Sequence, residues 1–144
     1  MALHPKRVGF RPQPRQLAAV FVGGCAGTFA RWAVQQAFGA VSGWPWAVFT
    51  VNLVGAFLLG LLLESLLRSV ADRGRPQLAR LFFGTGFLGS FTTWSALAVD
   101  VVALADGQRG ALAFGYLATS VTAGVVMAGA GMGVAARMHH GGGA

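Results

Sequence analysis

The residues best able to bind an ion form one cluster of glycines and hydroxyl side chains inside a long apolar stretch. Positions 84–95 read GTGFLGSFTTWS, which includes three glycines and five serines or threonines. In a membrane such a segment either stays helical, with hydroxyls bonded to the preceding turn, or breaks and exposes carbonyl oxygens. Exposed carbonyl oxygens bind hard cations, and the density of glycine favours a break. We therefore predict that the chain leaves the helix within this segment.

Asn52 is the second candidate for ion chemistry. It lies in the apolar sequence TVNLVG, where a polar side chain is energetically costly unless it has a partner or a function. Its amide offers two N–H donors, which suit a small anion. A hydrogen bond between helices is the more frequent role of such a residue, so both interpretations stand at this point.

Charged residues within the apolar stretches are few. Arg31 either extends to the membrane surface or anchors a polar network, and Asp100 is a candidate to pair with it. Nothing resembles a nucleophile beside a base, a zinc site or a phosphate-binding loop. We therefore expect no enzyme.

The composition predicts that these residues lie in a membrane. Of 144 residues, 55% are apolar and only 10% are charged, with a mean hydropathy of +0.62. A soluble domain carries about a quarter charged residues. Four apolar runs, at 17–38, 46–67, 78–105 and 111–136, each reach the roughly 20 residues that cross a bilayer.

The predicted fold is therefore all-α, with four transmembrane helices, the third broken mid-span. Residues 1–16 form a basic lead-in, 17–136 the transmembrane domain and 137–144 a tail. An even number of spans puts both termini on one side. That side carries nine of the eleven Lys and Arg residues: Lys6, Arg7, Arg11, Arg15, Arg68, Arg73, Arg75, Arg80 and Arg137. The termini should thus be cytoplasmic, and the net charge of +7 does not indicate nucleic-acid binding.

Small residues predict close helix packing. Gly23 and Gly27, and likewise Gly129 and Gly133, have the GxxxG spacing. The spacing fits packing within the chain and a subunit interface equally well. The single cysteine, Cys25, excludes an intrachain disulfide, and we predict that it is a small packing residue.

Three motifs together resemble the Fluc/CrcB fluoride channels. They are GGxxGxxxR ending at Arg31, VNLxG around Asn52, and GFLGxxTTxS ending at Ser95. Tyr116, in the fourth span, also fits, so the resemblance covers most of the chain.

The resemblance implies an antiparallel dimer with two fluoride pathways, which exports fluoride passively across the cell membrane. It implies a central sodium ion held by the carbonyls of Gly89 and Thr92. The implied pathway residues are Asn52, Trp94, Ser95, Leu97 and Tyr116, with Arg31 and Thr93 as structural polar residues. Fluoride is small and strongly hydrated, so such a path must offer donors and positive ring edges in place of water.

The chain departs from the family pattern where phenylalanines usually line the path. Trp94 and Leu97 occupy these two positions, Ala96 replaces a hydroxyl, and Val48 and Gly124 replace polar residues. Trp94 keeps ring edges and adds an N–H donor, whereas Leu97 offers neither.

The partner is either a second copy or a separate homologue. A homodimer of opposite orientations needs balanced Lys and Arg, and nine against two favours one fixed orientation with an oppositely oriented homologue. A non-conducting assembly subunit is the alternative function. A small multidrug exporter is excluded because the first span has no acidic residue.

Overall fold

The protein is a bundle of helices. The computed structural model describes residues 13–39, 43–67 and 75–140, and these contain helices and no strands. Four segments are long and apolar enough to cross a membrane: Pro14–Phe38, Trp46–Leu66, Pro76–Asp106 and Gly110–Met138. The predicted all-α fold with four spans is confirmed.

Three spans are continuous helices. Helix α1 covers Pro14–Phe38, α2 covers Trp46–Leu67 and α6 covers Gly110–His140. Helix α1 begins three residues before the predicted apolar run, because Pro14 needs no N–H partner and the Gln16 side chain accepts a hydrogen bond from the Gln13 N–H at 3.1 Å. Residues 1–12 of the predicted lead-in lie outside the described residues.

The third span is broken, as predicted. It consists of α3 (Arg75–Arg80), a π-helical segment η1 (Leu81–Leu88), α4 (Gly89–Phe91) and α5 (Trp94–Asp106). Thr92 and Thr93 separate its halves, with extended backbone angles of φ −75°, ψ 156° and φ −149°, ψ 114°. The glycines at 84, 86 and 89 remain helical, so the break is narrower than the cluster that predicted it.

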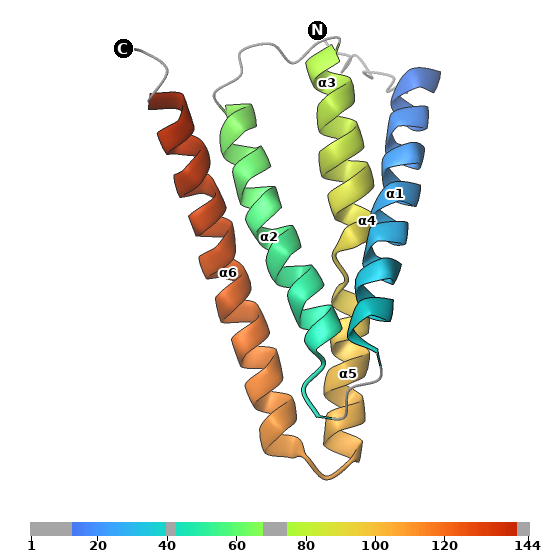
Figure 1. Ribbon diagram of the computed structural model, residues 1–144, viewed down its shortest axis with the longest axis vertical. Helices are drawn as coiled ribbons and strands as arrows, with labels where there is room; N and C mark the ends of the chain where they lie inside the picture. Colours follow the sequence, from blue (N-terminus) through green and yellow to red (C-terminus); the bar gives the residue numbers. More distant parts are fainter. Residues whose placement is uncertain (1–12, 40–42, 68–74, 141–144) are drawn as a thin grey trace, which may run out of the picture.

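Glycine contacts bring two pairs of helices together. Helix α2 packs along α6, and α1 packs along η1 (Figure 1). A Cβ on Gly23 or Gly27 would collide with the main-chain oxygens of Phe82 and Phe87, respectively. This GxxxG pair therefore packs within the chain, whereas a Cβ on Gly129 or Gly133 would meet nothing within 4 Å.

The charges separate between the two ends of the bundle. Helix α1 begins, α2 ends, α3 begins and α6 ends at one end, which we call the basic end (Figure 1). Arg15, Arg80 and Arg137 lie there, and Arg109 lies in the turn at the opposite end. Cys25 is exposed in the single chain, where the contacts of α1 with η1 are made by Gly23 and Gly27, so its predicted packing role is not seen within the chain.

Candidate functional site

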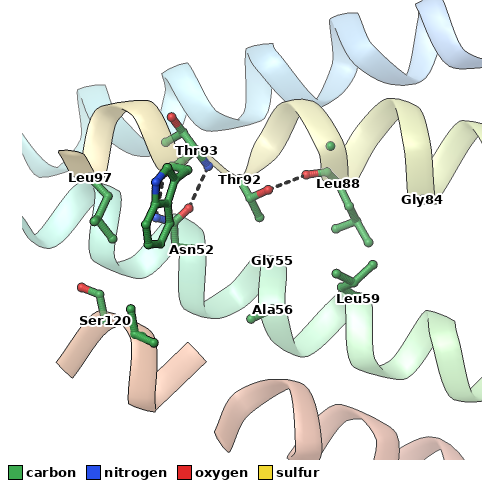
Figure 2. Close-up of a pocket in the computed structure, with 13 residues that line it drawn as sticks. Asn52, Gly55, Ala56, Leu59, Gly84, Leu88, Thr92, Thr93, Leu97 and Ser120 are labelled. Atoms are coloured by element: carbon green, nitrogen blue, oxygen red, sulfur yellow. Dashed lines mark hydrogen bonds between the residues drawn. The ribbon is translucent and has the colours of Figure 1, made fainter. Parts of the chain in front are cut away.

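Asn52 joins α2 to the break in the third span. Its Oδ1 accepts a hydrogen bond from the Thr93 N–H at 2.8 Å, and its Nδ2 donates to the Thr93 carbonyl at 2.9 Å (Figure 2). One side chain thus satisfies both main-chain groups of an extended residue that has no strand beside it. One N–H of the amide remains for another acceptor.

The break leaves several carbonyl groups without their helical donors, those of Gly89 and Thr92 among them. In a continuous helix the Thr93 N–H would donate to Gly89 and the Ala96 N–H to Thr92. Instead, the Thr93 N–H donates to Asn52, and the Ala96 N–H donates to Thr93 Oγ1 at 3.2 Å, which caps α5. The carbonyl oxygens of Gly89 and Thr92 therefore fit the predicted role of ligands for a hard cation.

Hydroxyl groups stabilise the two sides of the break. Thr92 Oγ1 donates to the Leu88 carbonyl at 2.9 Å, and Leu88 also accepts from the Thr92 N–H at 3.1 Å. The hydroxyls of Thr93 and Ser95 lie 3.2 Å apart. The structural polar role predicted for Thr93, which is 7% exposed, agrees with these contacts.

A groove of about 350 Å³ lies beside the break, between α2, the third span and α6 (Figure 2). We call it the central groove. Six of the residues predicted from the sequence line it: Asn52, Gly89, Thr92, Thr93, Trp94 and Leu97. Trp94 is 67% exposed, whereas Leu97 is 3% exposed and belongs to the core.

Two other predicted residues line a second cavity, of about 460 Å³, which we call the polar cavity. Arg31 and Ser95 lie there with Gln35 and Asp100, and Thr93 lines both this cavity and the central groove. Arg31 and Asp100 thus share a cavity, but they form no ion pair within 4 Å. The Asp100 carboxylate accepts a hydrogen bond from the Tyr116 hydroxyl at 3.4 Å.

Tyr116 lies apart from the central groove. Its side chain is fully buried in a cluster with Val48 and Leu97, beside the groove rather than in its lining. The structure therefore brings six predicted residues together, places two in the polar cavity and buries Tyr116 next to them.

Ser120 is a groove residue that the sequence analysis missed. It is 6% exposed, and its hydroxyl has no hydrogen-bond partner among the residues that the structure describes. It lies one turn after Tyr116 on α6 and lines the groove. Its spacing of four residues from Tyr116 was the signal that could have identified it.

The sequence is similar to known proteins. Residues 18–132 match the family described as CrcB-like protein, Camphor Resistance (CrcB). The chain belongs to the CrcB family. This membership confirms the resemblance drawn from the three sequence motifs.

Several CrcB relatives are similar over most of their length. The chain is 42% identical over 124 residues to fluoride-specific ion channel FluC 1 of Cutibacterium acnes, covering 85% of this chain and 87% of the relative. It is 42% identical over 113 residues to FluC 1 of Mycolicibacterium paratuberculosis, covering 78% and 83%. FluC of Bordetella petrii is 36% identical over 119 residues, covering 83% and 90%.

Proposed function

We propose that this chain is a subunit of a fluoride-selective channel that lets fluoride leave the cytoplasm passively. The observation that carries the proposal is the Asn52–Thr93 pair, which holds a helix break beside a groove in a chain of the CrcB family. The relatives are named as ion channels, in agreement with the expectation that the chain is not an enzyme.

The central groove offers the donors that a small anion needs. The second N–H of Asn52 is available, and Trp94 adds ring edges and an indole N–H. Each can replace part of the hydration shell of fluoride. Leu97 contributes an apolar wall only.

We propose that sodium binds at the carbonyls of Gly89 and Thr92. Their helical donors are diverted, so both oxygens can accept a cation. When bound, sodium would supply a positive charge that raises the affinity for an anion in the groove. Replacing sodium with N-methylglucamine should then lower the melting temperature of the purified chain, and an unchanged melting temperature would argue against the site.

The channel is expected to be an antiparallel dimer. The open positions at Gly129 and Gly133 offer α6 a face for close contact with a partner. The partner is a second copy or an oppositely oriented homologue, and the charges at the basic end favour the homologue. The same charges favour cytoplasmic termini in the cell membrane. Labelling of cysteines introduced at 109 and 137 of a C25A chain tests the orientation, because only position 109 should react from outside.

Growth of bacteria that lack their own fluoride channels tests the function. Expression of this chain, with its homologous partner where needed, should restore growth in fluoride, and N52D should not restore it. Full-length expression in the membrane without any gain in fluoride tolerance, alone or with the partner, would contradict the proposal.

A further inference from the structure

The net charge of the chain is concentrated at the basic end. By sequence this end carries nine Lys and Arg residues against two acidic residues, Glu64 and Asp72. The rest of the chain carries two basic and two acidic residues, which offset each other. The whole excess charge of +7 therefore belongs to the basic end.

The length of α6 places the arginines at its two ends at the level of the lipid headgroups. Arg109 directly precedes α6, and Arg137 lies in its last turn. At 1.5 Å per residue, the helix separates these two residues by about 40 Å along its axis. A bilayer measures about 30 Å across its hydrocarbon core and about 40–45 Å with its headgroup layers. With Arg109 in one headgroup layer, Arg137 therefore lies in the other.

The arginines of the basic end are spread across the whole width of the bundle. Arg15, in the first turn of α1, and Arg137 are both exposed, and they lie on opposite flanks, with α2 and the third span between them (Figure 1). Arg80, at the end of α3, is half-buried. Neither the central groove nor the polar cavity includes any of the three. Charges that are this far apart fit a surface of many anionic groups better than one small anion.

We propose that the basic end binds the anionic phospholipids of the leaflet that it faces. The phosphate groups of these lipids lie at the depth of Arg15 and Arg137, and each Lys or Arg at that depth is attracted to an anionic membrane surface. Because lipids diffuse within the leaflet, separate molecules can reach the arginines on each flank. The long side chains extend to the phosphates while their apolar stems remain along the helices.

This binding goes beyond the proposed function, since it requires neither fluoride nor sodium. It also differs from the preference of basic residues for the cytoplasmic side, which describes how a chain is inserted. The attraction to anionic lipid persists in the inserted protein. It predicts that the protein gathers anionic lipids around its basic end, and that salt weakens this enrichment.

Electron paramagnetic resonance of spin-labelled lipids tests the inference. The full chain is reconstituted in phosphatidylcholine bilayers that contain a trace of labelled phosphatidylglycerol or labelled phosphatidylcholine. In about 0.1 M salt we expect the protein to retain phosphatidylglycerol several-fold more strongly than phosphatidylcholine. In about 1 M salt the preference should largely disappear, because the Debye length falls from about 10 Å to about 3 Å. Equal retention of the two lipids at low salt would overturn the proposal.

Substitutions at the two ends of the bundle show where the lipid binds. R15Q/R137Q should lower the preference for phosphatidylglycerol, and R15K/R137K should keep it, because the charge is retained. R109Q is the control at the opposite end and should change the preference far less. The proposal is contradicted by an unchanged preference in R15Q/R137Q or by an equal loss in R109Q. All four proteins should melt alike in neutral detergent, since the arginines that are changed are exposed.

Inorganic phosphate distinguishes a lipid surface from a site for a free anion. It is added to the aqueous phase and compared with sodium chloride of equal ionic strength. We expect both salts to reduce the retention of labelled phosphatidylglycerol equally. Stronger displacement by phosphate would indicate a site for the free anion and would overturn the assignment to lipid.

Discussion

The carboxamide of Asn52 forms two hydrogen bonds with the main chain of Thr93, 41 residues later in the sequence, at 2.8 and 2.9 Å. This pair keeps Thr93 extended and diverts the N–H that would otherwise donate to Gly89. The helix break, the Gly89 carbonyl that lacks its helical donor, and the polar wall of the central groove therefore all depend on the Asn52 side chain.

Removing the Asn52 amide should destabilise the break and stop conduction. In N52A the Thr93 N–H and carbonyl lose their partners, at a cost of about 1–3 kcal/mol for each buried group. In N52D the new carboxylate can accept a hydrogen bond from the Thr93 N–H, but it repels the Thr93 carbonyl oxygen. Unfolding of the purified chain in detergent measures the loss. S65A is the control, because the Ser65 hydroxyl only donates to Leu61 in its own helix, and it should remain like the wild type.

The contact between Gly55 and Thr92 predicts a rescue. A Cβ on Gly55 would collide with the Thr92 methyl group, so G55A should destabilise the chain by about 1–3 kcal/mol. T92S removes that methyl and keeps the hydroxyl that donates to Leu88. The double variant G55A/T92S should recover most of the stability, and additive losses from the two changes would contradict the contact.

The two GxxxG pairs should respond differently to alanine. G27A places a methyl group against the Phe87 main chain, which cannot move aside easily, and should destabilise the monomer by about 1–3 kcal/mol. G133A meets nothing within 4 Å and should leave the monomer unchanged. Unfolding and cross-linking together separate the effects: a loss of dimer in G133A, without a loss of monomer stability, would support an interface on α6.

Phenylalanine should be tolerated in place of Trp94 but not in place of Leu97, the two positions that depart from the family pattern. Trp94 is 67% exposed, so W94F should fold like the wild type and lose only the indole donor. Leu97 is 3% exposed and packed with Val48 and Tyr116, so L97F should destabilise the chain by about 1–3 kcal/mol. Equal melting temperatures for W94F and L97F would show that the core around Leu97 is looser than described.

The transmembrane spans could be predicted from the sequence because a long apolar run indicates a segment surrounded by lipid. The bounds of α2 match its apolar run, and the glycine and hydroxyl cluster identified the helix that breaks. The π-helical geometry of 81–88 and the close contact of α1 with that segment could not be predicted, since neither hydropathy nor glycine spacing reports on them.

The site residues were predictable as types but not as partners. Asn52 and Thr93 were both candidate site residues. Only the tertiary structure shows that the Asn52 side chain forms hydrogen bonds with the main chain of Thr93. Ser120 could have been identified only by its spacing of four residues from Tyr116, because a serine in an apolar helix is otherwise ordinary. The pairing of Asp100 with Tyr116 instead of Arg31 likewise depends on which helices meet.

Fluoride efflux from liposomes is the most direct test of the function. The purified chain is reconstituted alone and with its homologous partner, and efflux of fluoride and of chloride is followed with ion-selective electrodes. We expect rapid fluoride efflux without chloride efflux, from the single chain or from the pair, and its loss when N52D replaces the wild type. Efflux of both anions, or of neither in any combination, would contradict a fluoride channel.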